Sequence, residues 1–231
     1  MSTSDRSVPS GPTNAGAPSS AAPQVYAGVD VGQGRVNAVL LSCAGTHRER
    51  PVWQVTARFD GSVIELTAFC RPAVRVAVDA PGGLSVGAHA GDLSVSPKFR
   101  TGRCSEVPSA GWPAVSWVTP SDMGAAPGWM HTGFTVWRAL EQDGAEVVEA
   151  FPAACFHRLN GRRWPPRKST PAGRGARLAL LADRVRLPGD AHTAWSHDDI
   201  DAAACALIAA TGRPALHDCR APDGSVMWLL Q

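Results

Sequence analysis

Four aspartates stand at positions from which a fold could build a metal-dependent catalytic centre. Asp30 and Asp79 each end a short apolar run typical of a buried strand, and Asp198 and Asp201 stand at the head of an alanine-rich helical pattern. Carboxylate oxygens are the ligands that Mg²⁺ and Mn²⁺ prefer. Two such ions, roughly 3.5–4 Å apart, can stabilise both the attacking and the leaving oxygen of a phosphodiester. The pattern therefore favours metal-assisted phosphodiester cleavage, with these four aspartates as catalytic residues and metal ligands.

The spacing of the two later aspartates supports a shared site. Positions i and i+3 of a helix lie on one face, so Asp198 and Asp201 should point the same way while Asp199 points elsewhere. Each also has a purely structural alternative. Asp198 could cap the helix, and Asp201 could be a favourable charge near its positive end. We interpret them as site residues because all four aspartates fall where one fold would gather them.

Three further polar residues are possible accessory groups. Glu149 ends another apolar strand pattern and could be a ligand, could orient Arg103, or could form a plain ion pair. Arg103 could stabilise charge on a phosphate, or could simply pair with Glu106 or Glu149. His197 directly precedes Asp198 and could act on a leaving oxygen or position a water. Its alternative is a capping or solvated role.

Residues 161–177 form a basic segment with six Lys or Arg residues and no acidic residue. Cationic groups on an irregular segment suit contact with a phosphate backbone, and an intervening tryptophan could stack on a base. The alternative is a solvated loop. The candidate nucleic-acid-binding residues are Arg162, Arg163, Trp164, Arg167, Lys168, Arg174 and Arg177.

The expected elements place the aspartates around a sheet. A hairpin is expected from residues 25–30 and 36–42, followed by a strand over 52–59, a helix over 62–71 and a central strand over 74–78. The stretch 81–128 is rich in Gly, Pro and Ser and has no clean periodicity. Beyond it we expect a helix over 129–141, a strand over 147–151, helices over 177–185 and 198–210, and a short closing strand over 226–230.

Composition indicates a single cytoplasmic domain after an N-terminal tail. Residues 1–24 are mostly Ser, Pro, Ala and Gly, which predicts a disordered tail, and residues 25–231 would form one domain. The net charge of +2 argues against a generally polycationic protein. No apolar run reaches the roughly 18 residues of a membrane helix, and the N-terminus lacks the layout of a secretory signal.

The cysteines show no metal-binding or disulfide pattern in the sequence. No pair has the C-x-x-C spacing, so we expect reduced, small core residues rather than a disulfide framework or a zinc site. The six are Cys43, Cys70, Cys104, Cys155, Cys205 and Cys219.

Five short strings carry a resemblance to a known family. The strings are Gly28-Val29-Asp30, Val78-Asp79-Ala80-Pro81-Gly82-Gly83-Leu84, Arg103-Cys104-Ser105-Glu106, Val148-Glu149-Ala150-Phe151-Pro152-Ala153 and Asp198-Asp199-Ile200-Asp201-Ala202-Ala203. Together they resemble the family called domain of unknown function 429, whose members are regarded as predicted ribonuclease H-like nucleases. The resemblance implies an α/β fold with a mixed five-stranded sheet, three antiparallel strands and then parallel ones, and helices on both faces. Lys168 and Arg177 also match the family's pattern, which implies that they could reach the active centre instead.

The Asp198-x-x-Asp201-Ala202 ending is also similar to the last catalytic helix of bacterial Holliday-junction resolvases. Carried over residue by residue, that similarity implies Asp30, Asp79, Asp198 and Asp201 as ligands of Mg²⁺ or Mn²⁺, a DNA or RNA substrate and a possible homodimer. Resolvases usually have Glu on the fourth strand, where this chain has Asp79. The reach of this shorter side chain to a second metal ion could therefore differ.

Two other functions stay open at this level. A ribonuclease H-like scaffold could bind nucleic acid or a protein without catalysis, and this applies if Asp30, Asp79 and Asp201 do not converge within metal-bridging distance. An actin-like ATPase or sugar kinase also opens with Asp-x-Gly on a hairpin. That class needs a duplicated domain, however, and this sequence has no second Asp-x-Gly hairpin.

Overall fold

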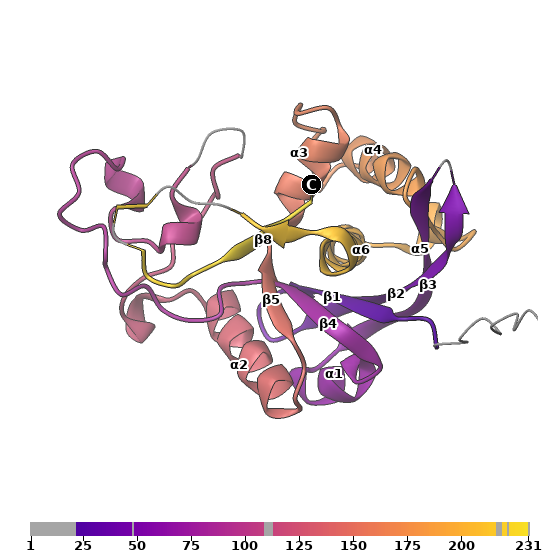
Figure 1. The fold of residues 1–231 in the computed structure, drawn as a ribbon, viewed down its shortest axis with the longest axis horizontal. Coiled ribbons are helices and arrows are strands. Elements are labelled where there is room, and N and C mark those ends of the chain that lie inside the picture. Colours follow the sequence, from indigo (N-terminus) through magenta and orange to yellow (C-terminus); the bar gives the residue numbers. More distant parts are fainter. Residues whose placement is uncertain (1–21, 48, 109–112, 216–218, 221, 231) are drawn as a thin grey trace, which may run out of the picture.

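A computed structural model describes residues 22–230 except for residues 48, 109–112, 216–218 and 221. Most of the predicted N-terminal tail, residues 1–21, therefore lies outside the described residues. The described chain is built on one mixed sheet of eight strands in the order β6-β3-β2-β1-β4-β5-β8-β7, with helices on both faces (Figure 1).

The five central strands have the expected arrangement. β1 (Val25–Val31), β2 (Val36–His47) and β3 (Arg50–Gly61) form an antiparallel meander. β4 (Ala73–Asp79) then pairs in parallel with β1, and β5 (Val147–Ala150) pairs in parallel with β4. Strands with continuous apolar runs, buried on both faces, are typical of the parallel part of such a sheet.

The expectation of a five-stranded sheet is wrong, because three short strands extend its edges. β6 (Val185–Arg186) pairs with β3, β8 (Met227–Leu229) pairs with β5, and β7 (Arg213–Pro214) pairs with β8. The closing strand was expected over 226–230, but its place in this sheet was not. Strands of two or three residues are too short to show an alternating pattern, so the sequence gives no signal for β6 and β7.

Helices cover both faces of the sheet (Figure 1). Two apolar clusters define these faces, one formed with α1 and α2 and the other with α3, α4 and α6. The helices are α1 (Val63–Cys70), α2 (Gly128–Gln142), α3 (Pro152–Leu159), α4 (Pro171–Ala182), α5 (Ala191–Ala194) and α6 (His197–Thr211). Helices α3 and α5 were not expected from the sequence. Helix α4 begins at Pro171, earlier than expected, because Thr170 caps it and accepts a hydrogen bond from the Gly173 amide.

Alternation along the central strands decides which face each aspartate occupies. Val29 of β1 belongs to the cluster on the α1–α2 face, whereas Ala77 of β4 belongs to the cluster on the α6 face. Successive side chains of a strand point to opposite faces. Asp30 and Asp79 therefore lie on the α6 face, and they are direct partners in the register of β1 and β4.

Helix α6 is held against the sheet at very close range. A Cβ atom on Gly28 would lie 2.0 Å from the Ala206 amide nitrogen and 2.1 Å from the Ala202 carbonyl oxygen. Only glycine allows this approach of β1 to the helix backbone. The residues of α6 from Asp199 to Ala209 are all buried, and alanine is the commonest residue among them. This packing fixes the height and rotation of α6, and with them the aspartates of its first turns.

The segment between β4 and α2 is largely irregular, as expected for residues 81–128. Its described part contains three short 3₁₀ helices, η1 (Pro97–Phe99), η2 (Cys104–Glu106) and η3 (Met123–Ala125), while residues 109–112 lie outside the description. This segment lies beside the C-terminal strand β8 (Figure 1).

The expectation that all six cysteines are reduced core residues is wrong for three of them. Cys104 and Cys219 form a disulfide, and Cys43 is exposed. The two bonded cysteines are 115 positions apart in the sequence, so their spacing gave no signal. Cys70, Cys155 and Cys205 are buried thiols, as expected.

Within the residues that the structure describes, none of the helices combines the length and the apolar character that a membrane crossing needs.

Candidate active site

A cavity of about 360 Å³ opens at the carboxyl ends of β1 and β4, and all four predicted aspartates line it. Asp30 comes from β1, Asp79 from β4, and Asp198 and Asp201 from α6. Parallel strands place their carboxyl ends at the same edge of a sheet, and the close packing of α6 on Gly28 brings the helix start to that edge. The structure thus gathers side chains from three distant parts of the sequence.

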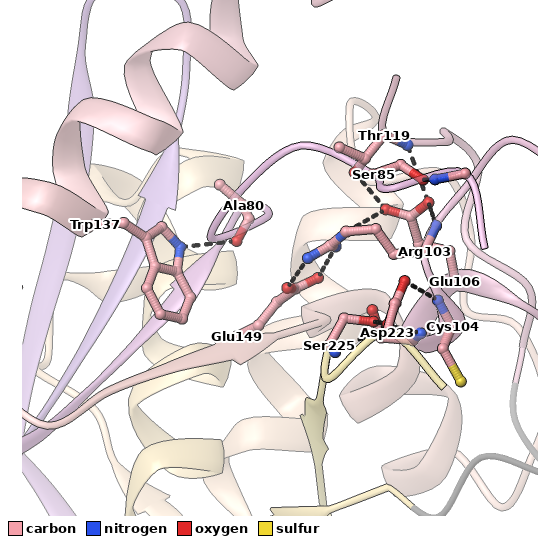
Figure 2. Close-up of polar contacts among 12 residues, drawn as sticks. Ala80, Ser85, Arg103, Cys104, Glu106, Thr119, Trp137, Glu149, Asp223 and Ser225 are labelled. Carbon is pink, nitrogen blue, oxygen red and sulfur yellow. Dashed lines mark hydrogen bonds and ion pairs between the residues drawn. The ribbon is translucent and has the colours of Figure 1, made fainter. Parts of the chain in front are cut away.

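Helix α2 supports the end of β4 from the other face. The Trp137 indole nitrogen donates a hydrogen bond of 3.0 Å to the carbonyl of Ala80, the residue after Asp79 (Figure 2). Gly133 of the same helix lies against Ala80, and a Cβ there would approach the Ala80 side chain to 2.6 Å. These contacts fix the backbone that carries the Asp79 carboxyl.

Burial and mutual repulsion raise the proton affinity of the two strand aspartates. Burial raises the pKa of Asp30 well above its usual value, and the nearby Asp79 and Asp201 carboxyls raise it further. Burial, followed by the Asp201 charge, raises the pKa of Asp79 to about 8. The pair therefore retains a proton at neutral pH unless a cation balances its charge.

Lys168 is the basic group closest to this acidic cluster. Its Nζ donates a hydrogen bond of 2.6 Å to Asp201 Oδ2, and its side chain lines the cavity. Burial lowers the pKa of Lys168, but the charges of Asp201, Asp30 and Asp79 outweigh that effect and raise it. The loop before α4 is pressed onto the helix at Gly173, where a Cβ would lie 1.9 Å from the Arg167 carbonyl oxygen. That contact positions the backbone next to Lys168.

Each carboxylate oxygen of Asp201 lies near a basic side chain, and Oδ2 accepts a hydrogen bond from Lys168. Oδ1 is buried and finds no hydrogen-bond partner among the described residues. The Arg177 Nη1 atom lies 3.8 Å from Oδ1. The Arg177 guanidinium packs 4.6 Å from the centre of the Phe156 ring. Buried polar atoms are normally paired, so Asp201 Oδ1 is available to a ligand.

The charges and donor atoms of the cavity suit a hard divalent cation. Four carboxylates and two basic side chains, Lys168 and Arg177, line it, so two negative charges are in excess when all are ionised. All the acidic donors are oxygens, as Mg²⁺ and Mn²⁺ require. Among the described residues, however, no three carboxylates have oxygens within 4.8 Å of one another. The aspartates surround the cavity without converging on one point.

The acidic residues in the first turn of α6 have different roles. Ser196 and Asp199 form a capping box, so the suggestion that Asp198 is the helix cap is wrong. Asp199 also accepts a hydrogen bond of 3.0 Å from the Asn37 side-chain amide and points away from the cavity, as expected. His197 Nδ1 lies 2.5 Å from Asp198 Oδ1, and His197 is not among the cavity-lining residues.

Arg103 and Glu149 form a buried ion pair outside the acidic cavity. Arg103 donates two hydrogen bonds to Glu149, of 2.7 and 2.6 Å, and one of 3.0 Å to Glu106 (Figure 2). Glu149 follows Val148, which belongs to the α6-face cluster, so the glutamate points to the opposite face of the sheet. Of the alternatives considered for these two residues, the structure has the ion pair. Glu106 also accepts a hydrogen bond of 3.0 Å from the Thr119 amide.

The basic segment divides into an exposed and an inward-facing part. Arg162, Arg163, Trp164 and Arg167 are exposed on the irregular stretch before α4, and Arg174 is half-buried on that helix. Lys168 and Arg177 line the acidic cavity, as the family pattern had implied. Arg177 is only 7% exposed, so it offers little outer surface to a polymer.

Several cavity-lining residues were missed from the sequence, among them a serine and two tryptophans. Ser116 and Trp117 come from the irregular segment, and Trp129 comes from the start of α2. The two indole rings meet edge to face with their centres 5.3 Å apart. Aromatic residues in a Gly- and Pro-rich stretch that follows a strand bearing a candidate catalytic Asp were a usable signal.

One family model matches part of the chain. Residues 129–223 match the family model described as "Protein of unknown function (DUF429)", which confirms the resemblance inferred from the sequence strings. The matching region includes Lys168, Asp198 and Asp201, whereas Asp30 and Asp79 precede it. None of the curated proteins compared with the chain matches it at a significant level.

Two solved structures are similar to the chain. The RuvC structure of Thermus thermophilus is 13% identical, with 80% of this chain and 92% of that chain covered and a TM-score of 0.42. The T. thermophilus RuvC in complex with a Holliday junction substrate is 10% identical, with 80% and 91% covered and a TM-score of 0.44. Because both identities are low and both TM-scores lie below 0.5, these similarities do not define a function for the present chain. Its function has to be inferred from its own side chains.

Proposed function

We propose that this protein is a divalent-metal-dependent nuclease that hydrolyses phosphodiester bonds of DNA or RNA. The observation that carries the proposal is the cavity that Asp30, Asp79, Asp198 and Asp201 line together with Lys168. The order of the five central strands supports a ribonuclease H-like fold, in which such acids occupy the first strand, the fourth strand and a late helix.

The four aspartates would hold Mg²⁺ or Mn²⁺. When bound, such ions activate a water and neutralise the charge that develops on a phosphodiester. Three features of the chain fit a divalent cation: the excess of two negative charges, the buried Asp201 Oδ1 that accepts no hydrogen bond from the described residues, and the raised pKa values of Asp30 and Asp79. Binding of a cation would release the proton that these two carboxyls retain.

The remaining side chains around the cavity suit a nucleic acid. The Lys168 ammonium can contact a phosphate, and the exposed Arg162, Arg163 and Arg167 on the adjoining segment can follow the polymer backbone. Trp117 and Trp129 provide aromatic surface beside the acids for an unstacked base. The accessory role of His197 would be exerted through its contact with Asp198.

Cleavage assays test the proposal directly. Labelled single-stranded DNA, duplex DNA, RNA and four-way junctions would be incubated with the protein in Mg²⁺, in Mn²⁺ and in a chelator. We expect metal-dependent cleavage that falls about 100-fold or more in Asp30→Asn and Asp201→Asn proteins. The matched control is Glu141→Gln, which makes the same carboxylate-to-amide change on the exposed face of α2. Equal cleavage by the Asn variants and the wild type would end the nuclease proposal.

A non-catalytic nucleic-acid-binding module is the second candidate. It is favoured by the spacing of the carboxylates, which do not converge within 4.8 Å among the described residues, and by the Lys168–Asp201 pair. Mn²⁺ calorimetry separates the two candidates. The nuclease proposal predicts saturable Mn²⁺ binding that Asp30→Asn abolishes. The binding-module proposal predicts that the affinity for nucleic acid is unchanged in a chelator and that the nucleic acid is not cleaved. A homodimer is a further prediction, which sedimentation of the full chain would test.

A further inference from the structure

His89 is a buried histidine to whose ring nitrogens no described residue makes a hydrogen bond. Its exposure is 1%, and neither Nδ1 nor Nε2 has a partner among the described residues. A neutral imidazole carries one donor and one acceptor, and buried polar groups are normally satisfied. Metal coordination is one of the few roles that would satisfy this side chain in an otherwise closed environment.

Two cysteines supply the other donors of a possible site. One donor atom each from His89, Cys104 and Cys219 lie within 4.8 Å of one another, and no other group of three in the described part of the chain does so. Imidazole and thiolate are the ligands that zinc prefers. This donor set differs in kind from the all-oxygen set of the aspartate cavity.

The segments that carry the two cysteines are also joined by contacts that do not involve sulfur. The Cys104 amide donates a hydrogen bond of 2.9 Å to Asp223, and the Ser105 amide donates one of 3.0 Å to Ser225 (Figure 2). Arg103 links the same turn to β5 through its two hydrogen bonds to Glu149. These contacts would hold the segments together when the disulfide opens. Zinc–sulfur bonds of about 2.3 Å place two tetrahedral sulfur ligands about 3.8 Å apart, so the two sulfurs must move apart when the disulfide opens.

We propose that His89, Cys104 and Cys219 bind a zinc ion in the reduced protein, and that the disulfide is the oxidised, metal-free form of the same site. Opening the S–S bond takes up two electrons and two protons from a dithiol reductant, which is itself oxidised to a disulfide. Zinc then binds the two thiolates and releases the two thiol protons. In either form the site ties the segment between β4 and α2 to the segment before β8.

Metal content of the full-length protein tests this inference without relying on nuclease activity. Protein reduced in the absence of oxygen would be given Zn²⁺ or the spectroscopic probe Co²⁺, with Mg²⁺ in excess to occupy carboxylates. We expect about one zinc per reduced chain, none in the oxidised chain, and a thiolate-to-cobalt charge-transfer band. Cys104→Ser and His89→Ala should each weaken zinc binding about 100-fold or more, whereas Cys43→Ser, at an exposed thiol, should leave it unchanged.

A protection experiment on the wild type avoids variants that fail to fold. Reduced protein would be alkylated with and without Zn²⁺, and each cysteine followed by peptide mass spectrometry. Zinc should slow alkylation of Cys104 and Cys219 together and leave the exposed Cys43 unaffected. Equal alkylation of Cys104 and Cys219 with and without zinc would overturn the proposal and leave a structural disulfide only. A cobalt band that persists in Cys104→Ser would also overturn it.

Discussion

Replacing Asp79 by asparagine should make the metal-free protein more stable, although it removes a proposed catalytic residue. Asp79 lies beside Asp30, and burial with the Asp201 charge raises its pKa to about 8 from the usual 3.8. The folded protein therefore keeps a proton that the unfolded chain releases above pH 4. By linkage, the free energy of unfolding of the wild type falls as the pH rises from about 4 to about 8 and levels off above that range. An amide carries no such penalty.

The size of the effect follows from the pKa of Asp79. At pH 7 the unfolded carboxyl is about three pH units above its pKa, and at about 1.4 kcal/mol per unit the penalty is about 4 kcal/mol. That figure is a ceiling, because Asp30 shares the same proton and Asp79 is partly exposed to the cavity. We expect the Asp79→Asn protein to be more stable than the wild type by about 2 kcal/mol at pH 7, allowing for this sharing.

Urea denaturation in a chelator at pH 5 and pH 8 measures the effect. The gain in free energy of unfolding should be larger at pH 8 than at pH 5, and Mg²⁺ should reduce it by stabilising the ionised wild-type site. Glu141→Gln is the control and should show no such pH dependence. An Asp79→Asn protein that is equally or less stable than the wild type at pH 8 would refute the account of the acidic cluster.

Three other substitutions test separate parts of the structure. In a urea titration, Gly28→Ala should lower the free energy of unfolding by about 3 kcal/mol, because its Cβ would meet the backbone of α6. The control Gly83→Ala adds a Cβ in open space and should change the free energy of unfolding by less than about 0.5 kcal/mol. Glu149→Gln should cost about 3 kcal/mol by breaking a buried ion pair, while Glu146→Gln, in an exposed pair, should cost under about 1 kcal/mol in thermal or urea denaturation. Similar costs for the two glutamines would contradict the structural role of Glu149. Trp117→Ala should weaken single-stranded nucleic-acid binding by about 1–3 kcal/mol in fluorescence anisotropy without divalent metal, and unchanged affinity would argue against base stacking in the cavity.

The sequence predicted those parts of the fold that have long, regular patterns. Continuous apolar runs and alternation located the five central strands, and an alanine-rich helical pattern located α6. The start of α4 was misplaced because Gly173 and Gly175 weaken the helical signal, although Thr170 and Pro171 form a recognisable helix start. Helix α3 was missed because it follows β5 almost without a connection.

The candidate site was predicted where it rests on strand ends and helix periodicity, and missed where it depends on packing. Asp30 and Asp79 were found because they end apolar runs. The inward position of Lys168 was implied only by the family pattern, because the contact between Gly173 and the loop before it leaves no signal in the local sequence. Trp117 reaches the cavity from an irregular segment, whose course depends on tertiary contacts such as the buried Arg103 ion pair rather than on local propensity.

The close packing of α6 on β1 also affects how the chain folds during biosynthesis. The β1–β3 meander is built from neighbouring segments and can pair as soon as it is translated, but the helix that covers its apolar face comes much later in the sequence. Until then a nascent chain exposes residues such as Val39 and Leu41, which are fully buried in the finished protein. Contacts between distant segments form slowly, so the interval before α6 docks is when the chain is most prone to aggregate and to need a chaperone.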